Sequence, residues 1–304
     1  MIIVYKMDKI DSIDSAEVAP TNEQDKRCAP GVTFESGSCI RLKVLISMAN
    51  AYNQQHPEGQ IKLFPQYEIL NPPKYKKYIL REMNKKMNGS QRSWASQLFV
   101  KQMDTLYKEE LEKHTFRPSG PKGKFEWLNT LHIDDVMGQY EQRYPQFKFL
   151  GTVPMDFDDF ERFGIRNLNY NELVNSGKTQ LGVVFNLDNH NESGSHWVAM
   201  YANLKDAKIY YFDSYGIEPE LRVRKLMRRI ARFCQTGLGI PDKQIVVDYN
   251  KHRHQKENSE CGVYSINFIL RLLRGDSFEN ICASQIPDRK INKCRNVYFN
   301  NTKV

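Results

Sequence analysis

The feature that most constrains the fold is a run of three apolar segments in the second half of the chain. They are LGVVFNL (181–187), HWVAMYANL (196–204) and AKIYYFD (207–213), and turn-rich residues separate them. The first two are apolar almost throughout, which is typical of strands that are covered on both faces. Helical patterns flank these segments, and a further strand is expected at 244–249. The sequence therefore predicts an α+β core.

The N-terminal part of the chain has a different pattern. Residues 1–26 are polar and acidic and are expected to form a flexible tail. Three helices are expected after it, over about 40–55, 72–87 and 93–113. They predict a helical arm domain at 27–115, and the Pro-, Gly- and Lys-rich stretch that follows predicts a linker opening the core domain, 116–304.

Composition excludes several classes of protein. The apolar fraction of 40% with 12% aromatics is that of a globular chain, and no segment approaches the roughly 18 consecutive apolar residues of a membrane span. The N-terminus is too acidic for a secretory signal, so a secreted protein is not expected. His252 and His254 with Cys261 lack a fourth ligand at a usual spacing, so neither a metal nor another cofactor is expected.

The cysteines indicate the redox environment. There are six, at 28, 39, 234, 261, 282 and 294, and none forms a CxxC pair. This pattern favours free thiols in a reducing compartment over a disulfide framework. Cys28 and Cys39 lie in loop-like stretches and are expected to be packing residues, not a redox pair.

Cys261 stands at the start of an apolar helical pattern, preceded by the polar loop NKHRHQKENSE. The unpaired amides and the positive end of the helix dipole at such a position stabilise an anion, and here they would favour a thiolate. A small buried cysteine at the start of a core helix is the other interpretation, because free cysteines are among the most buried residues. Partners elsewhere in the chain must decide between the two.

Two further residues stand at the ends of neighbouring strand candidates. His196 opens one strand and Asp213 closes the next. If these strands form an antiparallel hairpin, both residues lie at the same edge of the sheet. A carboxylate there can orient the imidazole and favour its protonated form, which in turn favours a thiolate at Cys261. Taken singly, His196 can be a loop residue and Asp213 a helix cap or turn former.

The order of these residues resembles that of a known clan of cysteine proteases, which includes the SUMO-specific proteases and the adenovirus protease. His196 precedes Trp197, Asp213 ends a strand in FDS, and Gln255 stands six residues before Cys261. The resemblance covers about residues 125–275. It implies a central mixed sheet flanked by helices.

The same resemblance implies a role for each of these residues. Cys261 is the nucleophile, His196 the base and Asp213 the orienting acid. The Gln255 side chain and the Cys261 amide form the oxyanion hole. Trp127, in the WLN stretch, and Trp197 match two tryptophans that cover a narrow slot for Gly-Gly, because flat indole walls admit only residues without side chains. Trp127 as a core residue is the alternative.

The N-terminal stretches CAPG and SGSCI and the run beginning WLNTLHIDD resemble polyprotein-processing proteases of large cytoplasmic DNA viruses, the type found in African swine fever virus. Those enzymes carry a helical arm ahead of the protease core. The orienting residue differs, since Asp213 is an aspartate, as in the SUMO proteases, whereas the African swine fever virus enzyme has an amide. The details of that enzyme therefore do not transfer directly.

The chain carries 44 Lys and Arg against 36 Asp and Glu, a net charge of +8 that favours acidic partners. Six basic residues lie in LRVRKLMRRIAR (221–232), on one side of an expected amphipathic helix. The candidate nucleic-acid contacts are Arg222, Lys225, Arg228, Arg229 and Arg232. A solvated face of a packed helix is the other interpretation.

The resemblance implies a cysteine endopeptidase that cleaves after Gly-Gly in viral structural precursors. Its substrate would be a polypeptide with Gly-Gly-X sites, DNA is a candidate activator, and no membrane partner is expected. The resemblance implies a location in the host cytoplasm and the virion. Three alternatives stay open: a protease that removes SUMO or another ubiquitin-like modifier, a clan-related acetyltransferase, and a non-enzymatic DNA- or core-binding component of the virion.

Overall fold

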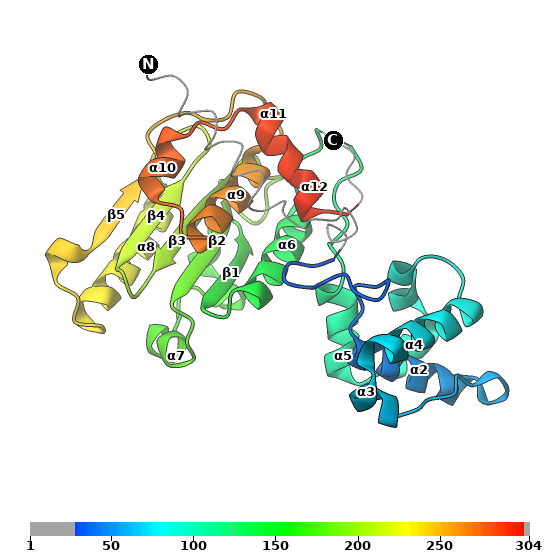
Figure 1. Cartoon of the computed structure of the whole chain (residues 1–304). Helices are drawn as coiled ribbons and strands as arrows, with labels where there is room; N and C mark the ends of the chain where they lie inside the picture. The colour runs from blue at the N-terminus through cyan, green and yellow to red at the C-terminus, as the bar shows by residue number, and fades with distance from the viewer. Residues whose placement is uncertain (1–27, 124, 301–304) are drawn as a thin grey trace, which may run out of the picture. The chain divides into compact units, whose positions relative to one another are not determined.

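The computed structural model describes residues 28–123 and 125–300, so the tail expected at 1–26 lies outside the described residues. The chain forms two compact units that meet in sequence at residues 118 and 119 (Figure 1). We call residues 28–118 the arm and residues 119–300 the core. Within the described ranges, no helix is long and apolar enough to cross a membrane.

The core contains a five-stranded mixed sheet with the strands in chain order (Figure 1). The strands are β1 (Phe147–Val153), β2 (Gln180–Asn186), β3 (Trp197–Asn203), β4 (Lys208–Phe212) and β5 (Val246–Tyr249). The β1–β2 and β4–β5 pairs are parallel, and the two pairs between them are antiparallel. The predicted α+β core with a mixed sheet is confirmed.

Helices complete the core. They are α6 (Thr130–Arg143), α7 (Tyr170–Asn175), α8 (Leu221–Thr236), α9 (Cys261–Leu273), α10 (Phe278–Ala283), α11 (Asp288–Ile291) and α12 (Arg295–Tyr298). Single 3₁₀ turns lie at Phe157–Asp159, Glu161–Phe163, Asp242–Gln244 and Asn292–Cys294. α8 packs its apolar side on one face of the sheet, and α9 lies against the other, where Phe268 stacks on Phe212 at 5.1 Å between ring centroids. Both faces are covered, as the apolar strands predicted.

The hairpin of β3 and β4 is the part of the fold that matters most for function. Its register pairs Ala199 with Phe212 and Asn203 with Lys208, so the strands run antiparallel as predicted. Residues just before β3 and just after β4 therefore come together where these two neighbouring strands begin and end, at the same side of the sheet. Those residues are His196 and Asp213.

The arm is a helical unit with its own apolar core. It contains α2 (Leu42–Gln55), α3 (Gln66–Leu70), α4 (Pro72–Lys86), α5 (Thr105–Glu109), 3₁₀ segments at Pro57–Gly59, Gln91–Ser96 and Leu98–Gln102, and a π-helical turn at Glu110–His114. The continuous helix expected over 93–113 is wrong. Gln97 and Met103 are extended, and the Asp104 carboxylate accepts the Leu106 amide 2.9 Å away, which starts a new helix.

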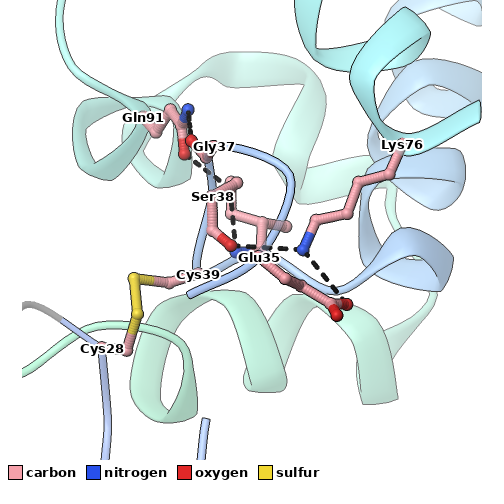
Figure 2. Close-up of a disulfide and its surroundings, with 8 residues drawn as sticks. Cys28, Glu35, Gly37, Ser38, Cys39, Lys76 and Gln91 are labelled. Atoms are coloured by element: carbon pink, nitrogen blue, oxygen red, sulfur yellow. Dashed lines mark hydrogen bonds and ion pairs between the residues drawn. A yellow bond between two sulfur atoms is a disulfide. The ribbon is translucent and has the colours of Figure 1, made fainter. Parts of the chain in front are cut away.

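The expectation that Cys28 and Cys39 are free packing residues is also wrong, because they form a disulfide (Figure 2). Both sulfurs are buried. Residues 35–38 form a tight turn within the closed loop, and α4 supports that turn through Lys76, whose ammonium donates to the Ser38 carbonyl at 3.2 Å and pairs with Glu35 at 3.6 Å. The turn brings Cys39 back to Cys28, a proximity that the linear spacing does not reveal.

Candidate active site

Cys261 is the first residue of α9 and is 2% exposed, so the predicted position at a helix N-terminus is confirmed. The next residue, Gly262, allows the helix end to approach its surroundings closely. A Cβ atom there would lie 3.0 Å from Cβ of Leu128 and 3.2 Å from Cδ1 of Trp197. The absence of a side chain at Gly262 thus lets the first turn of α9 pack closely against Leu128 and Trp197.

His196 and Asp213 lie together at the edge of the hairpin. The His196 Nε2 and Asp213 Oδ1 atoms are 2.6 Å apart, and both side chains are buried. A bond this short between an imidazole and a carboxylate is a charge-assisted hydrogen bond. The expected juxtaposition is therefore present.

Cys261 joins this pair electrostatically. Burial opposes charge on His196, but the hydrogen bonds to Asp213 and to Cys261, together with the negative charge on both partners, raise the pKa of His196 to about 9. The imidazole is then protonated at neutral pH, and an imidazolium stabilises a neighbouring thiolate. The structure thus brings three of the four predicted catalytic side chains into one interacting group.

Asp213 is held in place by its own backbone and by a residue that the sequence did not single out. The Asp213 amide donates to Oδ1 of Asn250 at 2.8 Å, and Nδ2 of Asn250 donates to the Asp213 carbonyl at 2.7 Å. The Tyr215 amide donates to Oδ1 of Asp213 at 2.8 Å. Asn250 is fully buried just after β5. In sequence it is indistinguishable from an ordinary turn residue, and only the parallel β4–β5 pairing brings it to Asp213.

Gln255, the fourth predicted residue, is fully buried in the loop between β5 and α9. Its Oε1 accepts from the Ser214 hydroxyl at 2.7 Å, and its Nε2 donates to the Glu257 carbonyl at 2.8 Å. Because a side-chain amide carries two N–H donors, the contact with Glu257 engages one of them. Ser214 follows Asp213 directly. Two consecutive residues therefore bond the two halves of the site, Asp213 to His196 and Ser214 to Gln255.

A second set of contacts anchors this loop from the C-terminal side. The Asp288 carboxylate accepts the Lys256 and Glu257 amides at 2.8 and 2.9 Å, and its other oxygen accepts the Tyr264 hydroxyl at 2.9 Å. Bonds between a carboxylate and backbone amides are among the stronger hydrogen bonds in proteins. Asp288 therefore fixes the backbone immediately after Gln255.

Glu260, the residue before the cysteine, is fully buried and fully engaged. Its carboxylate accepts from the Ser259 amide at 2.9 Å, from the Ser259 hydroxyl at 2.6 Å and from Nδ2 of Asn292 at 2.8 Å. Arg295 donates through Nη2 to the Ser259 carbonyl at 2.9 Å and through Nε to Asn292 at 2.7 Å. The C-terminal helical turns thus hold the chain on which Cys261 sits.

The two predicted tryptophans differ in their surroundings. Trp197 is buried, and its indole N–H donates to the Leu128 carbonyl at 2.7 Å. Trp127 is 47% exposed, so the alternative that it is a core residue is wrong. Trp127 lines two cavities, one of about 460 Å³ that it shares with Trp197 and one of about 790 Å³ that it shares with residues 256–260 and 285–289. It is therefore placed between two concave surfaces next to the cysteine loop.

Two of the basic side chains of α8 that were candidate nucleic-acid contacts form ion pairs within the core. Arg222 pairs with Asp159 at 2.7 Å and Arg229 pairs with Asp158 at 3.0 Å. The other three candidate nucleic-acid contacts, Lys225, Arg228 and Arg232, are exposed. In the part of the chain that the structure describes, no cluster of three or more His, Cys, Asp or Glu side chains could hold a metal ion.

Several known proteins resemble this chain in sequence or in structure. Residues 183–302 match the model of the Ulp1 protease family, C-terminal catalytic domain. A thiol protease of Acanthamoeba polyphaga mimivirus is 36% identical over 276 residues, covering 88% of this chain and 90% of that protein. A SUMO-1 cysteine protease of African swine fever virus is 27% identical over 222 residues, covering 67% of this chain and 79% of that protein. The crystal structure of an African swine fever virus protease superposes with a TM-score of 0.59 at 21% identity, covering 90% and 95% of the two chains, and shows that the fold is shared.

Proposed function

This chain belongs to the Ulp1 family of cysteine proteases, and we propose that it is an endopeptidase in which Cys261, His196, Asp213 and Gln255 carry out cleavage after Gly-Gly. One observation carries the proposal. The His196 imidazole bonds Asp213 at 2.6 Å, interacts with Cys261 and has a pKa of about 9. That group has the parts that a thiol nucleophile requires: a base, and a residue that orients the base.

Each residue has a defined step in the proposed reaction. The Cys261 thiolate attacks the carbonyl carbon of the scissile peptide, and the resulting oxyanion accepts hydrogen bonds from the Cys261 amide and the Gln255 side chain. The tetrahedral intermediate collapses, and the His196 imidazolium gives its proton to the departing amine. Water, deprotonated by His196, then hydrolyses the thioester. Asp213 keeps the imidazole oriented throughout.

The surroundings of Trp127 support a narrow, extended substrate. Trp197 is fixed by its bond to Leu128, while Trp127 stands between the two cavities. An extended polypeptide that crosses the Trp127 indole can place residues in both cavities while its central residues pass the aromatic wall. Glycine fits such a passage because it adds no side chain. The proposed substrate is therefore a polypeptide with Gly-Gly-X sites.

The relatives bear on where the enzyme acts. Those named above are proteins of large DNA viruses, which supports a viral structural precursor as substrate and the host cytoplasm and virion as location. Because the African swine fever virus relative is described as a SUMO-1 cysteine protease, removal of a SUMO-like modifier is the second candidate function. A modifier-removing enzyme must hold a folded protein, whereas a precursor protease needs only an extended segment.

The test compares substrates on one enzyme. Wild-type protein is given a Gly-Gly-X peptide, the same peptide with the second glycine replaced by alanine, and SUMO- and ubiquitin-based activity probes. We expect cleavage of the first peptide, loss of most of that activity with the second, and slow labelling by the probes. Labelling by the SUMO probe that outpaces peptide cleavage would favour the second candidate. Mass-spectrometric mapping of cleavage sites in a proteome digest, with Cys261→Ala as the blank, then gives the preferred sequence directly.

A further inference from the structure

A second aromatic ring lies against the proposed catalytic histidine. The Tyr215 ring stacks on the His196 ring, with 4.6 Å between centroids and 13° between planes. The guanidinium carbon of Arg253 lies 4.7 Å from the centroid of the same tyrosine ring. Tyr215 and Arg253 come from two different loops, the turn after β4 and the segment after β5. Neither has a step in the reaction described above.

The local sequence explains how these two loops meet. Gly216 has φ +75°, and a Cβ atom there would lie 2.7 Å from the His252 carbonyl carbon and 3.0 Å from the Arg253 nitrogen. Only glycine permits both this conformation and this approach of the backbone. Gly216 thereby lets the 252–253 segment come close enough to set the Arg253 side chain over Tyr215.

Arg253 also contacts the other half of the site. Its Nε donates to the Gln255 carbonyl at 2.6 Å. The Gln255 amide donates in turn to the Ser214 carbonyl at 2.9 Å. One guanidinium therefore contacts both the ring that supports His196 and the backbone of the proposed oxyanion donor.

We propose that Tyr215 and Arg253 form a positioning pair that keeps the His196 imidazolium in place and couples it to the loop that carries Gln255. This inference rests on the proposed function of His196 and Gln255. The face of an aromatic ring attracts a cation, so the Tyr215 ring favours the protonated imidazole while limiting its rotation. The Arg253 hydrogen bond ties the position of that ring to the Gln255 backbone, so a shift in one half of the site is transmitted to the other.

The first test changes the ring. Tyr215→Phe keeps the aromatic face, and Tyr215→Leu removes it. We expect Tyr215→Leu to lower kcat on a Gly-Gly-X peptide about tenfold with little change in KM, and Tyr215→Phe to stay within about twofold of wild type. Alkylation of Cys261 by iodoacetamide, in which the thiolate displaces iodide, is followed against pH by peptide mass spectrometry. At alkaline pH, the alkylation rate should change where the imidazolium loses its proton. We expect this change to occur at lower pH in Tyr215→Leu and at the wild-type pH in Tyr215→Phe.

The second test changes the cation. Arg253→Gln should lower kcat about fivefold, and Arg253→Lys should recover only part of it, because lysine keeps the charge but lacks the Nε donor. Lys251→Gln is the matched control, since Lys251 on the same segment lies 5.3 Å from the ring centroid of Tyr249 and pairs with Asp248 at 3.1 Å. The double variant Tyr215→Leu with Arg253→Gln should have a kcat of at least about half that of the slower single variant, as expected for coupled residues.

Three results would overturn the positioning pair. These are losses in the double variant that multiply, an effect of Arg253→Gln no larger than that of Lys251→Gln, and an alkylation profile that does not move in Tyr215→Leu. Circular dichroism and thermal melting establish that each variant is folded, and Arg253→Gln keeps the proposal testable if Tyr215→Leu does not fold. The alkylation assay requires no peptide. A profile that moves in an enzyme that ignores Gly-Gly peptides would therefore refute the proposed substrate and leave the positioning pair intact.

Discussion

The core and the arm differ most in the polar side chains that they bury. In the core, polar groups that are normally exposed are fully or almost fully buried next to Cys261, and each has a defined partner; they include Asp213, Asn250, Gln255 and Glu260. In the arm, five large apolar side chains that are normally buried lie on the surface, at 46–86% exposure: Tyr67, Ile69, Leu70, Leu98 and Leu106. The core also exposes large apolar side chains, so the buried polar cluster is what distinguishes it from the arm; those exposed side chains are Phe125, Trp127, Leu131, Ile217, Leu221, Val246 and Val247.

The two units also differ in net charge. Residues 28–118 contain fourteen Lys and Arg against eight Asp and Glu, while the core, at about twice the length, contains 25 against 22. The basic character of the described chain is therefore concentrated in the arm. The comparison indicates that changes in the core should alter chemistry, whereas changes in the arm should alter stability without altering chemistry.

The largest expected effect is loss of the nucleophile in the core. Cys261→Ala should lower kcat on a Gly-Gly-X peptide by at least about 10⁴-fold, because no other group can form the thioester. Steady-state kinetics measures this loss, and thermal melting should stay within a few degrees of wild type. Cys282→Ala, at a half-buried thiol outside the site, is the matched control and should retain activity. A Cys261→Ala protein that remains fully active would place the chemistry elsewhere.

Loss of the proposed oxyanion donor should have the next largest effect. Gln255→Ala should cost roughly 2.7 to 4 kcal/mol of transition-state stabilisation, seen mainly in kcat. Gln255→Glu keeps an acceptor for Ser214 but loses both N–H donors, including the one that bonds the Glu257 carbonyl. We expect both variants to be slow. Activity of Gln255→Glu close to wild type would mean that the side chain only holds the loop.

Alkaline pH should weaken the core through His196. The folded-state pKa is about 9, above the ordinary value of 6.5. A raised pKa contributes stability fully below pH 6.5, and this contribution is lost as pH rises through about 9. Its size is on the order of 3 kcal/mol at most. Denaturant unfolding of wild type and His196→Gln at pH 6 and pH 10 measures it. The difference between the two proteins should shrink at pH 10, and a difference that does not depend on pH contradicts the ion pair.

The disulfide provides the matching test in the arm. Replacing Cys28 and Cys39 by serine should destabilise the arm by about 2 to 3 kcal/mol, since the bond closes a short loop. Limited proteolysis and melting with and without reductant report this loss. Peptide cleavage at a temperature where the arm stays folded should change less than about twofold. A larger loss of peptide cleavage in this variant would contradict the expectation that changes in the arm leave the chemistry of the core unaltered.

Much of the core followed from the sequence because its signals are local. The apolar strands and the turn between them predict the β3–β4 hairpin, which brings His196 to Asp213. The helical pattern after Cys261 predicts α9. Asn250, Tyr215, Arg253 and Asp288 were not predicted, since each acts through a loop whose path depends on tertiary packing. In the arm, side-chain caps such as Asp104 outweighed the apolar period that predicted one helix over 93–113.

The anchoring of the cysteine loop has a consequence for the timing of synthesis. Asp288, Asn292 and Arg295 come after every residue proposed to take part in catalysis, yet they hold the backbone around Gln255 and Glu260. A ribosome-bound chain that has released α9 already contains Cys261 but not these anchors. The hydrogen bonds of Asp288, Asn292 and Arg295 can therefore form only when the segment carrying α11 and α12 has left the ribosome.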